Sequence, residues 1–291
     1  MKPIAYAAPP TVEAAVQLLA EHGERARVLA GGTDIIVQLR EGRRQADVLV
    51  DIKRIGELNE LSFDAARGLR IGAAVPCCRI YEYEPIARRY AALVDSASLI
   101  GGVQVQSRGS LGGNLCNASP AADSTPSLIA LSAVCVVVGP EGRREVPADQ
   151  FCTGPGRTVL GTGELLVGFQ LPAPPPHSGS AYLRFIPRNE MDIAVAGAGV
   201  AVTLDERKQR CTAARIALAA VAPTPLFVRE AAAVLLQGEI SDERVEQAAA
   251  AAQAAARPIS DMRGEAEYRR HLTGVLVRRA LHQAIQRAKE N

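Results

Sequence analysis

Two glycine pairs, each set among small polar residues, constrain the fold of this chain more than any other sequence feature. The first lies in Ala30-Gly31-Gly32-Thr33-Asp34, after a predicted strand at 27–30 and before an apolar run that starts at Ile35. Paired glycines let a backbone turn sharply and bring its N–H groups close to an anion. The segment has neither the G-x-G-x-x-G pattern nor a P-loop lysine. A tight turn without a ligand therefore stays an alternative.

The second glycine pair lies in Ser110-Leu111-Gly112-Gly113-Asn114, within a predicted turn over 110–117. Farther along, Ser119-Pro120 predicts the start of a helix. Asp123 can accept a hydrogen bond from a ligand hydroxyl, although it can equally cap a helix. Two such turns, one in each of two α/β units, predict a diphosphate or dinucleotide held between the units.

Hydrophobic patterning predicts an α+β fold with several parts. The predicted helices cover 12–22, 83–100, 127–133, 225–237, 242–256 and 265–289, and Thr125-Pro126 is the predicted start of the third. The predicted strands cover 27–30, 47–52, 69–73, 134–138, 165–171, 194–204 and 212–221. The proline run at 172–176 is the clearest boundary. We therefore predict three domains, at 1–55, 56–176 and 177–291.

Composition narrows the possible functions. Apolar residues make up 48% of the chain and charged residues 22%, without an apolar run long enough to span a bilayer. The first residues lack the apolar core of a secretory signal, so we expect a cytoplasmic protein. The net charge of +2 argues neither for nor against an anionic partner, but the lack of a basic stripe with interleaved aromatics argues against nucleic-acid binding.

Cysteine and histidine spacing argues against a metal site. The six cysteines include no C-x-x-C pair, so the spacing of an iron–sulfur or zinc site is absent from the sequence. The four histidines are scattered and have no ligand spacing. An electron carrier with this sequence would need a cofactor that requires no thiolate ligands, and we predict no metal ligand and no catalytic side chain.

Five sequence blocks resemble the FAD-binding subunits of molybdenum hydroxylases, a family that includes the carbon monoxide dehydrogenase medium subunit and the xanthine dehydrogenase flavin domain. The blocks are AGGTDIIVQLR at 30–40, SLGGNLCNASPAADSTPSLIAL at 110–131, ELLVGFQLP at 164–172, RFIPRNEMDIAVAGAGVAV at 184–202 and YRRHLTGVLVRRAL at 268–281. They follow the family's order across nearly the whole chain. The resemblance implies FAD as the cofactor.

The resemblance also implies which residues bind FAD. Segments 29–35 and 110–114 are expected at the diphosphate, Asp123 at the ribityl or adenosine part, and Ile100 and Leu166 beside the isoalloxazine ring. Arg184 stands where relatives commonly have lysine beside the flavin, and Arg188 and Asp192 match a further family block. The complete predicted set is Leu29, Ala30, Gly31, Gly32, Thr33, Asp34, Ile35, Ile100, Ser110, Leu111, Gly112, Gly113, Asn114, Asp123, Leu166 and Arg184.

For Arg188 and Asp192 the alternatives are a structural pair at a domain interface and direct flavin contact. Gln106 is another departure, because many relatives have arginine at this position.

In architecture, the resemblance implies two N-terminal α/β subdomains that clasp FAD, in a fold related to that of vanillyl-alcohol-type oxidases. It also implies a C-terminal domain with a three-stranded antiparallel sheet and helices. The implied partners are a small [2Fe-2S] subunit and a large molybdopterin subunit, in a dimer of heterotrimers. Electrons would reach FAD from the clusters and leave to NAD, a quinone or oxygen.

Two alternatives remain on the sequence alone. One is a stand-alone FAD-dependent oxidase or dehydrogenase, although the chain has no Trp, five Phe and six Tyr with which to build a substrate pocket over a flavin. The other is a scaffold subunit that has lost its cofactor, against which the intact glycine turns argue.

Overall fold

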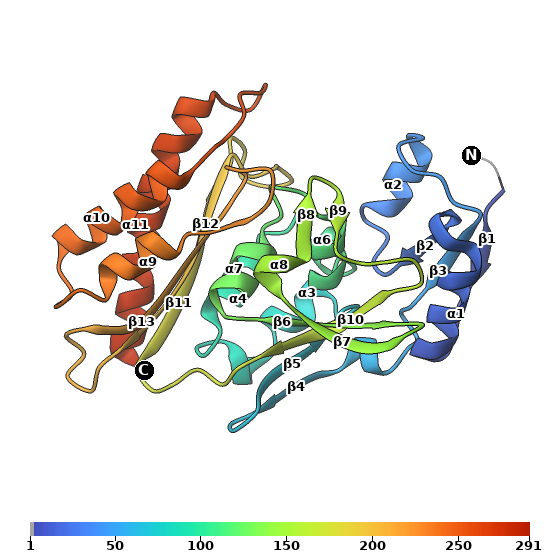
Figure 1. Ribbon diagram of the computed structural model, residues 1–291, viewed down its shortest axis with the longest axis horizontal. Helices are drawn as coiled ribbons and strands as arrows, with labels where there is room; N and C mark the ends of the chain where they lie inside the picture. The colour runs from blue at the N-terminus through green and yellow to red at the C-terminus, as the bar shows by residue number, and fades with distance from the viewer. Residues whose placement is uncertain (1–2) are drawn as a thin grey trace.

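The computed structural model describes residues 3–291, which form three parts arranged along the long axis of the molecule (Figure 1). Each part is built on its own principal sheet, and the strand orders are β1-β3-β2, β4-β5-β10-β6-β7 and β11-β12-β13-β14. The middle part therefore contacts both of the others and connects them.

The N-terminal part is a parallel sheet covered by one amphipathic helix. Its strands are β1 (Ala5–Ala7), β2 (Ala26–Leu29) and β3 (Val48–Asp51), and β3 pairs in parallel with both neighbours. Helix α1 (Val12–His22) begins where the Thr11 hydroxyl accepts a hydrogen bond from the Ala14 N–H, and its apolar side packs into the core. The short helix α2 (Ile35–Arg40) follows β2 after the first glycine pair.

The middle part is a five-stranded antiparallel sheet with short helices on it. Its strands are β4 (Leu61–Asp64), β5 (Gly68–Gly72), β6 (Val134–Gly139), β7 (Gly142–Pro147) and β10 (Leu165–Leu171). Its helices are α3 (Cys77–Tyr81), α4 (Ala91–Ala97), α5 (Val103–Gln106), α6 (Leu111–Asn117), α7 (Ser124–Ala130) and α8 (Ala148–Phe151). A small hairpin of β8 (Cys152–Gly154) and β9 (Arg157–Thr158) follows α8.

The C-terminal part has a four-stranded antiparallel sheet, so the predicted three-stranded sheet is wrong. Its strands are β11 (Ser178–Phe185), β12 (Ala196–Leu204), β13 (Cys211–Ala219) and β14 (Leu226–Phe227). The fourth strand was missed because it has two residues, too few for an alternating pattern. The helices are α9 (Arg229–Leu235), α10 (Asp242–Ala255) and α11 (Ala266–Glu290), of which α11 packs along β11 and β12.

Three predicted local elements are wrong. Between Tyr83 and Ile100 the chain forms a 3₁₀ turn at Glu84–Ile86 and the separate helix α4, in place of one helix. The helix predicted at 127–133 begins earlier, at Ser124, so Thr125 and Pro126 lie in its first turn. The predicted turn at 110–117 is the helix α6, because the Ser110 hydroxyl accepts a hydrogen bond from Gly113 N–H and caps it.

The C-terminal part is attached to the middle part by a charged contact and a close backbone contact. The Arg287 guanidinium on α11 donates to both carboxylate oxygens of Asp95 on α4, at 2.6 and 3.0 Å. A Cβ at Gly199 on β12 would lie 2.7 Å from the carbonyl carbon of Pro126 on α7. Glycine at this position lets the sheet lie directly on the helix.

A steric prediction follows from the contact between β11 and α11. A Cβ at Gly179 would overlap the Ala284 carbonyl oxygen and the Ala288 nitrogen, whereas nothing lies within 4 Å of a Cβ at Gly56. Because backbone atoms cannot move aside cheaply, we expect Gly179→Ala to destabilise the fold by about 1–3 kcal/mol.

Urea denaturation of the variants, followed by circular dichroism, measures this effect. Gly56→Ala is the matched control, and its midpoint should stay within experimental error of the wild type or rise slightly. Equal midpoints for Gly179→Ala and wild type would contradict the packing described here.

Candidate cofactor-binding site

A cavity of about 440 Å³ lies between the N-terminal and middle parts, within the size range of ligand and cofactor sites. The end of β2 and the start of α2 line one side, and the first residues of α6 line another. Residues 156–166, from the β8–β9 hairpin to the start of β10, line a further side. In Figure 1, β2 and α2 lie on the blue side, and α6 and the β8–β9 hairpin lie on the green side next to them.

Glycines are required where the segments that form the cavity meet. A Cβ at Gly31 would overlap the carbonyl oxygen of Arg108, and a Cβ at Gly112 would overlap that of Ala73. Gly32 has a φ of +80°, a conformation that residues with a side chain rarely adopt. The glycine pairs thus serve two purposes, a turn at Gly32 and close backbone approach at Gly31 and Gly112.

The first glycine segment presents unpaired hydrogen-bond donors. Within residues 3–291, the N–H groups of Gly31 to Ile35 donate no hydrogen bond, and neither does the hydroxyl of Thr33. The N–H groups of Leu111 and Gly112 are also without an acceptor in this part of the chain. Backbone N–H groups in a protein normally have a partner. Donors gathered along one cavity therefore fit a ligand with many acceptor oxygens, such as the diphosphate of FAD.

A polar bridge joins the two sides of the cavity. Asn117, at the end of α6, donates from Nδ2 to Asp34 Oδ1 at 3.3 Å and accepts from Gln38 Nε2 at 2.8 Å. Asp34 and Gln38 are one helical turn apart, so their side chains lie on the same face of α2. Desolvation raises the pKa of Asp34, and no ion pair within residues 3–291 offsets it. This bridge fixes the orientation of α2 relative to α6.

Most of the residues predicted to bind FAD line this cavity. They are Ala30, Gly31, Gly32, Thr33, Asp34, Ile35, Ile100, Ser110, Gly112, Gly113, Asn114 and Leu166. Asn114 also has a structural role, because its Oδ1 accepts hydrogen bonds from the Ser124 N–H at 3.2 Å and the Ser124 hydroxyl at 2.6 Å. Direct contact of these residues with FAD stays a prediction.

Four predicted residues do not line the cavity. Leu29 and Leu111 are buried, with Leu111 in the core of the middle part. Asp123 and Arg184 are also buried, and they bind each other. Both glycine segments have residues that line the cavity, whereas the side chains of Leu29 and Leu111 are buried in the protein.

Asp123, Tyr182 and Arg184 form a buried cluster between α7 and β11. Asp123 Oδ1 accepts from the Tyr182 hydroxyl at 2.7 Å, and Oδ2 accepts from Arg184 Nη1 at 2.6 Å. Burial raises the pKa of Asp123 to about 6, although the charge of Arg184 and both hydrogen bonds lower it. The Arg184 Nε has no hydrogen-bond partner within residues 3–291. The Asp123 side chain therefore binds the C-terminal part and makes no capping hydrogen bond to α7.

The loop between β11 and β12 holds Arg188 and Asp192 together. Arg188 N donates to Asp192 Oδ2 at 3.1 Å, and Arg188 Nη2 donates to the Met191 carbonyl at 2.8 Å. These contacts stay within one loop, so they do not join two domains, and direct contact of the pair with a flavin stays a prediction. Gln106 takes part in no ion pair: it donates to the Ser98 carbonyl and accepts from the Tyr81 hydroxyl.

Several residues that line the cavity were not predicted from the sequence. Gln38 and Asn117 lie within the segments used for the family resemblance, and the spacing of Gln38 four residues after Asp34 was a usable signal. Arg27, Arg44 and the β8–β9 hairpin had no such signal, because only the fold brings them to the cavity.

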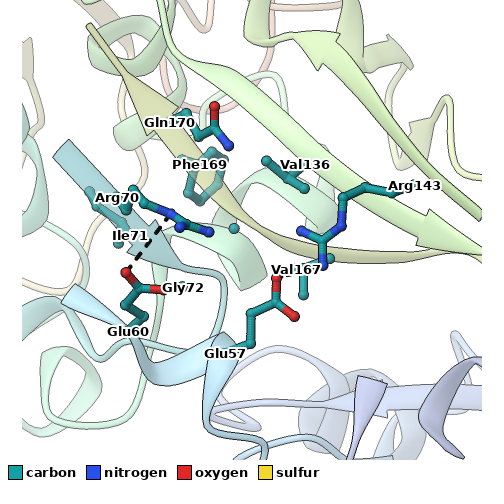
Figure 2. Close-up of a pocket in the computed structure, with 11 residues that line it drawn as sticks. Glu57, Glu60, Arg70, Ile71, Gly72, Val136, Arg143, Val167, Phe169 and Gln170 are labelled. Carbon is teal, nitrogen blue, oxygen red and sulfur yellow. Dashed lines mark hydrogen bonds and ion pairs between the residues drawn. The ribbon is translucent and has the colours of Figure 1, made fainter. Parts of the chain in front are cut away.

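A second cavity, of about 20 Å³, lies elsewhere on the middle sheet and holds at most about one water molecule. Figure 2 shows acidic and basic side chains around it, with Glu60 paired to Arg70 at 3.8 Å and Glu57 to Arg143 at 2.7 Å. Its charges are already balanced in pairs, so it is not a cofactor site.

Two absences within residues 3–291 bear on the function. No group of His, Cys, Asp and Glu in this range has the geometry of a metal site. No helix in the same range has the length and apolar character needed to cross a membrane.

Sequence comparison shows the family. Residues 2–174 match the FAD binding domain in molybdopterin dehydrogenase, and residues 181–284 match the CO dehydrogenase flavoprotein C-terminal domain. The carbon monoxide dehydrogenase medium chain of Afipia carboxidovorans is 35% identical over 284 residues, 98% of this chain and 97% of the relative. The xanthine dehydrogenase FAD-binding subunit of Escherichia coli O157:H7 is 32% identical over 277 residues, 94% of each chain.

Solved structures support the same family assignment. CO dehydrogenase from Oligotropha carboxidovorans contains a chain that matches with a TM-score of 0.93 and 33% identity over 98% of each chain. Quinoline 2-oxidoreductase from Pseudomonas putida 86 matches with a TM-score of 0.90 and 29% identity over 99% of each chain.

The relatives that match nearly the whole chain are oxidoreductase subunits, and this chain shares their fold. We therefore identify it as an oxidoreductase subunit. The chain belongs to the family of FAD-binding medium subunits of molybdenum hydroxylases. The family resemblance and FAD as the cofactor are thereby confirmed.

The pKa of Asp123 predicts a pH effect on stability. A carboxyl whose pKa is about 6 in the folded chain and 3.8 in the unfolded one binds more protons when folded. Its contribution to stability is therefore full below the unfolded pKa and is lost as the pH rises through about 6.

Urea denaturation of wild type and Asp123→Asn between pH 4 and pH 7 isolates this contribution. Because Asn cannot ionise, the free energy of unfolding of wild type should fall relative to that of the variant as the pH rises. A difference between the two proteins that does not change with pH would contradict the raised pKa.

Proposed function

We propose that this chain accepts electrons from the [2Fe-2S] clusters of a small partner subunit and passes them through FAD to an external acceptor. The cavity between the two glycine segments, with its unpaired N–H donors, is the observation that supports this best. Bound FAD supplies the redox chemistry, and the chain supplies binding, orientation and electrostatics. In this proposal NAD, a quinone or oxygen is the acceptor, and the chain does not bind the organic substrate.

Each side of the cavity has a separate task in this proposal. The N–H groups of Gly31 to Ile35 and of Leu111 to Gly112 bind the diphosphate, and the Asp34–Asn117–Gln38 bridge sets the spacing between them. The apolar side chains of Ile100 and Leu166 border the isoalloxazine ring and exclude water from it. Asp123 and Arg184 do not line the cavity and act by holding the C-terminal part against the middle part.

The names of the relatives, a medium chain and an FAD-binding subunit, support a proposal about the assembly. We propose a heterotrimer with a small [2Fe-2S] subunit and a large molybdopterin subunit, which dimerises, in the cytoplasm. We also propose that residues 1–55 and 56–176 are the two subdomains of a fold related to vanillyl-alcohol-type oxidases, and that residues 177–291 are the third domain. The sheets at 5–51, 61–171 and 178–227 support this division.

Rapid mixing tests the proposed direction of electron flow. The co-expressed partner subunits are reduced with dithionite, freed of excess reductant, and mixed anaerobically with the FAD-loaded chain. We expect the flavin absorption band to bleach as the cluster absorption recovers, because the flavin is the next carrier.

The control mixes the chain with partner subunits in which the clusters have been removed. No bleaching should occur there. Bleaching without clusters, or no bleaching with a complex that has assembled by size-exclusion chromatography, would contradict the proposed route.

A further inference from the structure

Few charged side chains line the cavity. Within residues 3–291, Arg27 and Arg44 are the only lysine, arginine or histidine side chains that line it. The acidic residues that line it are Glu24, Asp34 and Glu164. Glu164 Oε1 forms an ion pair with Arg144 Nε at 2.6 Å. Because Arg144 does not line the cavity, the charge of Glu164 is balanced from outside it.

Both arginines lack an acidic partner. Arg27, on β2, donates from Nε to the Gln45 carbonyl at 3.2 Å, and Arg44 donates from Nη2 to the Gly156 carbonyl at 3.4 Å. Neither forms an ion pair within residues 3–291. Two neighbouring arginines behave differently, because Arg25 pairs with Asp47 and Arg43 with Glu41. The unpaired arginines are thus the ones that reach the cavity.

The two guanidinium groups also repel each other. The pKa of Arg27 is lowered, first by burial and then by the charge of Arg44, while Glu24 raises it. Bringing like charges together at a partly buried site costs free energy unless an anion binds between them. The glycine segments offer N–H donors but no cation, and Asp34 adds a negative charge beside them. A diphosphate carries a negative charge on each phosphate group and would need a counter-charge here.

We propose that Arg27 and Arg44 bind the diphosphate of FAD and supply the positive charge that the glycine segments lack. This inference rests on the proposed function and assigns two further residues to its cofactor site. Guanidinium groups suit phosphate oxygens because they donate several hydrogen bonds in a fixed plane. The Arg44 contact with Gly156 also places the β8–β9 hairpin at the same site.

The test measures FAD affinity of the full chain after removal of its cofactor. Arg27→Gln and Arg44→Gln should each raise the Kd for FAD about tenfold, as expected for loss of a charge-assisted hydrogen bond. Arg43→Gln is the matched control, because this side chain lies in the same loop, pairs with Glu41 and does not line the cavity. Its Kd should equal that of wild type.

Three readouts show whether the arginines act on the diphosphate or on another part of FAD. The dissociation constant of ADP, obtained from competition with FAD after allowing for the changed FAD affinity, should rise in the arginine variants, whereas that of adenosine should not change. Added salt should weaken FAD binding more in wild type than in the double variant. Arg27→Lys should recover part of the lost affinity, because it keeps the charge.

Several outcomes would overturn the proposal. They are an unchanged Kd for FAD in the double variant, an equal loss for ADP and adenosine, or a changed KM for NAD in the assembled enzyme with unchanged FAD affinity. Thermal melting shows whether a variant is folded, and only folded variants count. A wild-type chain that binds no FAD, alone and together with its partner subunits, would instead refute the proposed function, so the two failures can be distinguished.

Discussion

The close contact between Gly31 and the backbone of Arg108 is the constraint on which the cofactor cavity depends. Any side chain at position 31 would overlap the Arg108 carbonyl oxygen, so the N-terminal and middle parts can meet here only through glycine. This contact places the two glycine segments along the same cavity. The unpaired N–H groups of both segments therefore face one shared space, where a diphosphate could bind.

The position of the C-terminal part depends on ion pairs that are largely shielded from water. Asp123 and Arg184 are buried and paired at 2.6 Å, and Arg287 binds Asp95 at the same interface. Removing one partner of a buried pair costs more than the pair contributes, because a lone charge remains. Such contacts fix which surfaces of the middle and C-terminal parts meet. The C-terminal part is therefore held in a definite position on the middle part.

Much of the fold could be predicted from local patterns. Strand β10 was predicted with its observed bounds, and α10 and α11 within a residue at each end, because their apolar periodicity is long and uninterrupted. The helix predicted at 83–100 is wrong because Pro85 lies in a 3₁₀ turn at Glu84–Ile86 and α4 begins only at Ala91. The strands β8, β9 and β14 are too short to give a pattern at all.

The site residues also include some that the sequence could predict and some that it could not. The glycine segments were recognisable because their chemistry lies in consecutive residues, and most of their members line the cavity. Asp123 could not be placed from sequence, since its partners Tyr182 and Arg184 are far along the chain. Arg27 and Arg44 were overlooked for a similar reason, as an arginine facing a cavity and one facing solvent look alike in a sequence.

The central claim is that this chain carries FAD, and the most direct test is the cofactor content of the purified protein. An absorption spectrum is recorded first, and the cofactor is then released with acid and identified by chromatography against FAD and FMN. We predict FAD in a molar ratio close to one per chain, either as purified or after incubation with FAD. A colourless chain that also fails to bind added FAD, alone and together with its partner subunits, would contradict the claim.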